Sequence, residues 1–183
     1  MLCFSASKTL DTIYKILDTN NMIILGLDPG IARTGFGILD SSKPQLYVNC
    51  GCLTTSKEEE PAARLLQIGQ DTITLIRKYK PDTAVVEDIF FNTNTSTAIL
   101  TAQTRGVLLY VLQEHHVRIT SLTPLQIKSR LTGFGRADKK QVQSMISRRL
   151  NLACAPQPDD AADALAAALC EVDKKPETND ILA

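Results

Sequence analysis

The fold is decided by residues 22–30, MIILGLDPG, in which an unbroken apolar run ends at one carboxylate and a Pro-Gly turn. A run of this kind predicts a central β-strand, because strands that are buried on both faces are almost entirely apolar. A charge at the end of such a strand is costly unless something compensates for it. Asp28 is therefore a candidate functional residue, although an acid at a turn is about as often only a cap or a surface residue.

Short strands and turns follow directly. Residues 35–39 and 46–53 have strand character, and Ser-Ser-Lys-Pro at 41–44 predicts the turn between them. Three consecutive strands joined by short turns predict an antiparallel meander.

The rest of the chain alternates helices with strands. Helical patterns cover 61–80, 97–115, 124–131, 139–150 and 160–172, and short strands are predicted at 84–87 and 117–122. This order predicts an α/β domain of the ribonuclease H-like fold. It would hold a five-stranded mixed sheet, three antiparallel strands followed by two parallel ones, flanked by helices.

Composition narrows the classes of function without choosing one. The chain has 183 residues, 44% hydrophobic and 22% charged, with a formal net charge of zero. Nucleic-acid binding would therefore have to rest on a local basic cluster. Its five cysteines are scattered and lack zinc-ligand spacing, which favours reduced thiols and a cytoplasmic protein. No stretch approaches the length of a membrane span.

Three further acids stand where the pattern predicts the end of a strand or the start of a helix. Glu87 ends the apolar strand at 84–87, while Asp160 and Asp163 begin an Ala-rich helix and share one face of it. Helix capping accounts for one or two acids at a helix start, and we assign Asp159 to that role. It does not account for Asp163, which interrupts the apolar face of the helix.

A divalent metal ion would account for all four acids. Oxygen ligands without His or Cys favour Mg²⁺ over zinc, with Mn²⁺ as a substitute. Asp28, Glu87, Asp160 and Asp163 are thus candidate catalytic and metal-binding residues for two Mg²⁺ ions. Two such ions would activate a water molecule and stabilise the departing oxygen in phosphodiester hydrolysis.

The ordered set of motifs resembles the RuvC family of Holliday-junction endodeoxyribonucleases. The similarity runs from about residue 22 to 171, and its motifs are these: ILGLDPG at 24–30 with TGFG at 34–37, VEDIF at 86–90, TRGV at 104–107, GFGRADK at 133–139 and DAADAL at 160–165. Each motif is weak alone, and the ordered set is specific.

The resemblance implies a metal-dependent endonuclease that makes paired, symmetric nicks in four-way DNA junctions and leaves 5′-phosphate ends. It also implies a homodimer, and partnership with the RuvA and RuvB branch-migration proteins in DNA recombination and repair. The metal-binding acids carry over as the four named above, in the all-carboxylate form of the family. The dimer interface is expected on the helix at 97–110, which has too many apolar positions for one buried face.

DNA contacts are expected from a local basic segment. Residues 128–149 hold seven cations against one acid. Lys128 and Lys139 match basic residues that the family uses near the active site. Arg136 lies in the same segment, and Arg105 is a weaker candidate. Phe90 falls where the family carries an aromatic residue that stacks on a junction base. A charge run is also often only a solvated helix face, and Phe91 competes with Phe90 for the stacking role.

The expected organisation is one nuclease domain at 22–173, preceded by a poorly ordered extension at 1–21 that the family lacks and followed by a polar tail at 174–183. Three alternatives remain open. An actin-like or sugar-kinase-like ATPase shares the strand order, but it needs two lobes and gives Asp160 and Asp163 no role. The others are a non-catalytic DNA-binding or assembly module, and a nuclease of the same fold acting on RNA or on RNA–DNA hybrids.

Overall fold

A mixed five-stranded sheet forms the centre of the molecule in the computed structural model, which describes residues 21–89 and 95–173. The strand order is β3-β2-β1-β4-β5. β1 pairs antiparallel with β2 and β2 with β3, while β1 with β4 and β4 with β5 are parallel. The predicted sheet is therefore confirmed. The strands are β1 (Ile23–Asp28), β2 (Arg33–Asp40), β3 (Tyr47–Thr54), β4 (Thr83–Glu87) and β5 (Arg118–Leu122).

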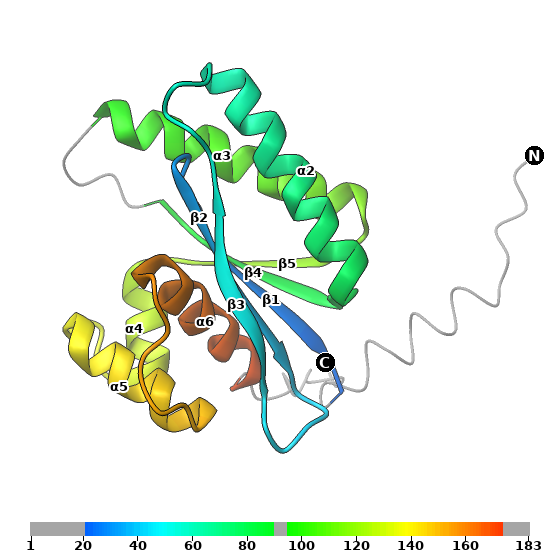
Figure 1. The fold of residues 1–183 in the computed structure, drawn as a ribbon. Coiled ribbons are helices and arrows are strands. Elements are labelled where there is room, and N and C mark those ends of the chain that lie inside the picture. The colour runs from blue at the N-terminus through cyan, green and yellow to red at the C-terminus, as the bar shows by residue number, and fades with distance from the viewer. Residues whose placement is uncertain (1–20, 90–94, 174–183) are drawn as a thin grey trace, which may run out of the picture.

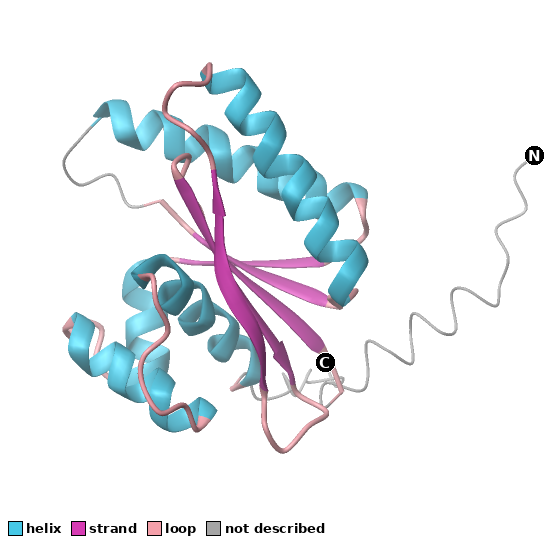
Figure 2. Cartoon of the chain, viewed as in Figure 1, coloured by secondary structure: helices cyan, strands magenta, loops and turns pink. Residues whose placement is uncertain are grey.

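Helices cover both faces of this sheet, as Figures 1 and 2 show. One layer holds α2 and α3, and the opposite layer holds α4, α5 and α6. The helices are α2 (Pro61–Tyr79), α3 (Thr95–Glu114), α4 (Pro124–Thr132), α5 (Lys139–Leu150) and α6 (Asp159–Val172). No helix in the described part of the chain has the length and apolar character needed to cross a membrane.

Local signals set most helix ends. Thr123 and Asp138 each form a capping box with the residue three positions on, which fixes the starts of α4 and α5. Gly133 ends α4 with φ of 77°, a left-handed conformation that suits glycine. The predicted elements are confirmed to within about two residues. The largest differences are of two residues: β2 begins at Arg33 and not at residue 35, and α3 begins at Thr95 and not at residue 97.

Two hydrophobic clusters pack against the two faces of the sheet. One joins the sheet to α4, α5 and α6, and the other joins it to α2 and α3. α6 lies unusually close to β1 and β2. A Cβ atom on Gly26 would stand 1.9 Å from the Ala164 carbonyl oxygen, and one on Gly35 would stand 2.0 Å from that of Asp160. Two glycines therefore let the backbone of the last helix rest directly on the sheet.

Candidate active site

The four predicted acids come from three elements that meet at one edge of the sheet. Asp28 ends β1 and Glu87 ends β4, and these strands are parallel neighbours in which Leu27 pairs with Val86. Their last residues therefore emerge side by side. Asp160 and Asp163 lie in the first turns of α6, and the contact between Gly35 and Asp160 holds the start of that helix against β2.

Hydrogen bonds fix the turn that follows Asp28. The Thr34 hydroxyl donates to the Gly30 carbonyl at 2.8 Å, and the Thr55 hydroxyl donates to the Ile31 carbonyl at 2.6 Å. Arg64 Nε donates to Thr55 Oγ1 at 2.9 Å, which ties the turn to α2. The carboxylate of Asp28 is thus presented by a turn with its own side-chain supports, not by a free loop.

Burial and neighbouring charges raise the pKa of Asp28, Glu87 and Asp163. Burial is the main cause that raises the pKa of Asp28 to about 8, and the charges of Glu87, Asp163 and Asp160 act in the same direction. Burial also raises the pKa of Glu87 to about 7, assisted by Asp163. The pKa of Asp163 is raised as well, chiefly by burial. Like-charged carboxylates near one another in this way favour a bound proton or a bound cation.

The donor set fits a hard divalent cation. The four acids offer only oxygen ligands, which suits Mg²⁺. The nearby Cys52 does not add a thiolate, because burial and the charge of Asp160 raise the pKa of its thiol. In the described residues, no three His, Cys, Asp or Glu side chains are gathered tightly enough to hold an ion as they stand. Binding an ion would require these carboxylates to draw together.

Two of the predicted basic residues face the same cavity as two of the acids. Glu87, Lys128, Lys139 and Asp163 line a hollow of about 240 Å³ between β4, α4, α5 and α6. The charge of Lys128 partly offsets the rise in the pKa of Glu87, and the charge of Lys139 partly offsets the rise in the pKa of Asp163. Acids that would bind a metal ion and cations that would bind phosphate therefore line the same cavity.

Asp159 does not cap α6, so that assignment is wrong. Pro158 occupies the N-cap position, and α6 has no side-chain capping bond. Asp159 instead pairs with Lys139 Nζ at 2.8 Å and accepts a hydrogen bond from Gln143 Nε2 at 3.0 Å. The acid beside the candidate ligands therefore holds one of the predicted DNA-binding cations.

The sequence pattern did not reveal Arg33 as part of the site. Arg33 Nε lies 3.0 Å from Asp160 Oδ2, across an ion pair that joins the start of β2 to the start of α6. The alternation of side chains along β2 could have indicated Arg33. It lies on the same strand face as Gly35 and Gly37, and α6 packs against both glycines. That signal became usable only once the strand was known to begin at Arg33.

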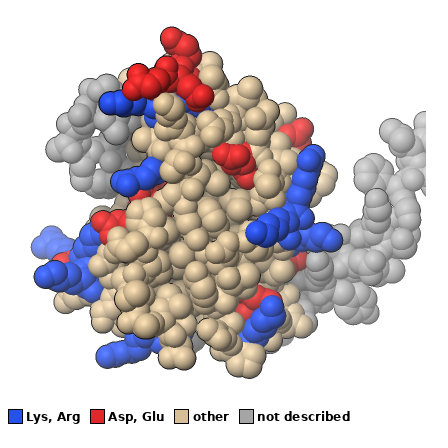
Figure 3. Space-filling model, in the orientation of Figure 1, with Lys and Arg blue, Asp and Glu red and all other residues tan. Residues whose placement is uncertain are grey.

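The other predicted DNA-binding residues lie outside this cavity. Arg105 is mostly buried, with its Nη2 2.8 Å from Ser121 Oγ and 3.3 Å from Asp88 Oδ1. Arg136 is exposed in the loop between α4 and α5. Phe90 and Phe91 lie outside the described residues. Figure 3 shows basic side chains along the edge where α4 and α5 lie, where Lys140 and Arg148 line a separate open groove.

Comparison with known proteins points to one family. The family model described as "Crossover junction endodeoxyribonuclease RuvC" matches residues 24–171. A protein of that name from Petrotoga mobilis is 45% identical over 151 residues, which cover 81% of this chain and 92% of the relative. One from Alkaliphilus metalliredigens is 47% identical over 150 residues, with coverage of 81% and 92%.

Solved structures agree with this match. The chain resembles Thermus thermophilus RuvC in complex with a Holliday junction substrate, with a TM-score of 0.76 and 30% identity, over 81% of this chain and 92% of that one. A yeast mitochondrial Holliday junction resolvase shares the fold at a TM-score of 0.60 and 14% identity, over 81% of this chain and 77% of that one.

Proposed function

The chain belongs to the crossover junction endodeoxyribonuclease RuvC family, and on that premise we propose that it is a Holliday-junction resolvase. It would cut four-way DNA junctions by paired, symmetric phosphodiester hydrolysis in recombination and repair. The observation that carries the proposal is the meeting of Asp28, Glu87 and Asp163 at one sheet edge, where Glu87 and Asp163 raise the pKa of Asp28 and Asp163 raises that of Glu87. Asp160 lies in the same helix turn as Asp163.

We propose that Asp28, Glu87, Asp160 and Asp163 hold Mg²⁺, two ions in each site, with Mn²⁺ as a substitute. When bound, such ions supply an activated water and stabilise the charge of the departing 3′ oxygen. The protein's part is to hold desolvated carboxylates at a fixed edge of the sheet. The raised pKa values of Asp28, Glu87 and Asp163 support this role, because a site that resists negative charge gains most from a cation.

DNA binding is proposed for the basic side of the site. Lys128 and Lys139 line the cavity with two of the acids, which supports a role in contacting phosphates near the cut. Arg136 would contact the backbone farther along the same edge. Arg105 is the weakest candidate, since its guanidinium is engaged by Asp88 and Ser121. Phe90 remains the proposed stacking residue.

A homodimer is proposed through α3. Its apolar residues lie on all sides of the helix, so that Leu108 is fully buried while Ile99 is 58% and Tyr110 67% exposed. Sedimentation at micromolar concentration tests this, and a monomer would contradict it. Partnership with RuvA and RuvB remains a prediction that rests on the family resemblance, and a cytoplasmic location remains a prediction that rests on the cysteine pattern.

The deciding experiment is cleavage of a synthetic mobile four-way junction, with and without Mg²⁺. Wild-type protein is compared with Asp163→Asn and with the matched control Asp71→Asn on α2, in the opposite layer. The proposal expects paired, metal-dependent nicks that are lost in Asp163→Asn and kept in Asp71→Asn, while Asp163→Asn still binds the junction.

Each competing function gives a different result. Tight binding without cutting by the wild type would indicate a non-catalytic DNA-binding module. Preferential cutting of RNA or of an RNA–DNA hybrid, included as competitors, would reassign the substrate. If the wild type neither binds nor cuts the junction, the nucleotide-binding alternative would be favoured, and ATP would be the next ligand to test.

A further inference from the structure

We propose that Arg33 is a positioning residue that couples DNA binding to metal binding, and this inference rests on the proposed nuclease function. In the DNA-free protein Arg33 neutralises Asp160. When DNA binds, the guanidinium moves to a backbone phosphate, and Asp160 becomes free to join the other carboxylates around the metal ion.

The first support is the state of Asp160. Its Oδ2 atom is shut off from solvent and accepts no hydrogen bond in the described part of the chain. Its ion-pair partner is Arg33, whose Nε lies 3.0 Å away, and the charge of Lys139 also acts on Asp160 without forming an ion pair with it. A buried carboxylate oxygen is costly without a partner, so Arg33 can leave only when another cation takes its place.

The second support is the position of Arg33. It begins β2 on the strand face that carries Gly35 and Gly37, and those glycines receive α6. Arg33 is the next residue on this face beyond Gly35, at the level where α6 begins. Its side chain is therefore not covered by the helix, and 57% of its surface is exposed. Within residues 21–89 and 95–173, the guanidinium forms no hydrogen bond and no second ion pair, although its charge also acts on Asp159, so donors remain available for phosphate.

The third support is the placing of charge around the site. Lys128 and Lys139 line the wall formed by α4 and α5, while Arg33 approaches from β2 through its contact with Asp160. A phosphate bound beside Asp160 would meet cations from β2 and from α5, because Lys139 also interacts electrostatically with Asp160. As it drew Arg33 away from Asp160, it would leave an oxygen that a metal ion can compensate, so each ligand would strengthen the binding of the other.

The test compares wild type with Arg33→Gln in two separate titrations. Calorimetric titration of the DNA-free protein with Mn²⁺ should show about fivefold tighter binding in Arg33→Gln, because Asp160 is already released. Fluorescence anisotropy with a labelled four-way junction in EDTA should show about fivefold weaker binding and a salt slope lower by about one. A purely structural defect would weaken both.

Two control variants sharpen the reading. Lys43→Gln removes a cation whose ion pair with Asp40, also 3.0 Å, lies at the other end of β2, and it should change neither titration. Lys128→Gln removes an equal charge from the cavity wall, where the described residues give it no ion pair. It should weaken junction binding but tighten Mn²⁺ binding less than Arg33→Gln does.

An equal gain in Mn²⁺ affinity in Lys128→Gln and Arg33→Gln would overturn the proposal, because general electrostatics would then suffice. Unchanged Mn²⁺ affinity in Arg33→Gln would overturn it too. Arg33→Lys provides a second variant that keeps the charge, and it should retain the wild-type salt slope. If wild type binds no junction, the proposed function fails, while the Mn²⁺ titration still decides whether Arg33 restrains Asp160.

Discussion

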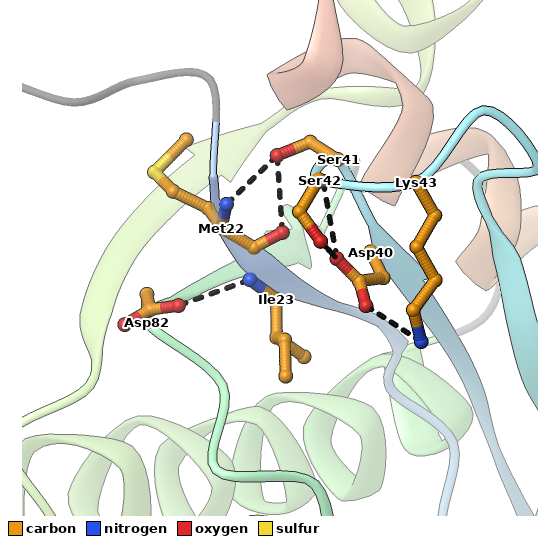
Figure 4. A network of polar contacts seen from close by, with 7 residues as sticks. All are labelled: Met22, Ile23, Asp40, Ser41, Ser42, Lys43 and Asp82. Atoms are coloured by element: carbon orange, nitrogen blue, oxygen red, sulfur yellow. Dashed lines mark hydrogen bonds and ion pairs between the residues drawn. The ribbon is translucent and has the colours of Figure 1, made fainter.

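The two ends of the β1–β2 pair each carry an acid, and the protein treats the two acids in opposite ways. Asp40 lies opposite Ile23 at one end, and Asp28 lies opposite Gly35 at the other. Around Asp40, Ser42 donates through its hydroxyl at 2.5 Å and its backbone N–H at 3.1 Å, and Lys43 pairs with it at 3.0 Å. Figure 4 shows this network. Asp28 has other carboxylates as its neighbours.

The partners of an acid distinguish one that stabilises the fold from one that is available to bind a ligand. The Ser42 hydroxyl is the main cause that lowers the pKa of Asp40, with Lys43 also contributing, so its charge is satisfied by the protein alone. Burial and repulsion raise the pKa of Asp28 to about 8, so its charge is left for something outside the chain to satisfy. Both acids end apolar strands, and only their partners distinguish them.

Replacing Asp by Asn at each end of the β1–β2 pair should give the largest difference, in the rate of junction cleavage. Asp28→Asn should reduce junction cleavage about 10³-fold, equal to about 4 kcal/mol of activation free energy, because it removes a proposed metal ligand. Asp40→Asn should leave cleavage per folded molecule unchanged. Single-turnover cleavage at saturating Mg²⁺ measures both. Equal losses in the two variants would contradict the division of roles.

The contact of α6 with β2 should be the next most sensitive feature. Gly35→Ala would place a methyl group 2.0 Å from the Asp160 carbonyl oxygen and should cost about 3 kcal/mol or more of unfolding free energy. Urea unfolding measures this. The control is Gly106→Ala on α3, where an added Cβ has no atom within 4 Å, and helix propensity should stabilise by up to about 1 kcal/mol. Similar effects in both variants would argue against the tight contact.

The pH dependence of metal-free stability should come from the active-site end. The folded-state pKa values of Asp28 and Glu87, about 8 and about 7, exceed their ordinary values of 3.8 and 4.5. Stability is then fully present below about pH 4 and is lost progressively as pH rises through the folded-state pKa values to about 8. Urea unfolding in EDTA from pH 4.5 to 8.5 measures this, and Mg²⁺ should restore the loss. Stability that is flat across this range, or that rises, would refute the prediction.

The smallest effect is expected at the other end, with the opposite sign. Because the pKa of Asp40 is lowered, its contribution is present above its ordinary pKa near 4 and lost as pH falls below that value. Asp40→Asn should cost about 1 kcal/mol at pH 7 and almost nothing near pH 2.5, as measured by thermal unfolding at the two pH values. An equal cost at both would attribute the loss to packing.

The sequence predicted the architecture well because strong local signals mark it. The apolar run before Asp28, the proline at position 61 and the capping boxes at Thr123 and Asp138 each depend on neighbours within four residues. The four acids were likewise predictable from their places at the ends of elements, and their ligand role remains a proposal. The strands and helix predicted from hydrophobic periodicity were therefore enough to expect these acids at one edge of the sheet.

The partners of the acids were not predictable in the same way. Arg33 meets Asp160 across 127 positions in the chain, and Lys139 meets Asp159 across 20, so no local pattern records either pair. The wrong assignment of Asp159 has the same origin. Capping preference is a local tendency, and a tertiary ion pair overrode it once Pro158 stood at the cap.

The close seating of α6 on β1 has a consequence for the making of the protein. β1 is the first strand of the described domain and α6 is its last helix, so the proposed site draws on both ends of the folded chain. An unfinished chain that stops before α6 carries Asp28 and Glu87 but neither Asp160 nor Asp163. If these acids act as proposed, nascent and truncated products should be unable to nick DNA, and completion of synthesis would then limit premature cutting.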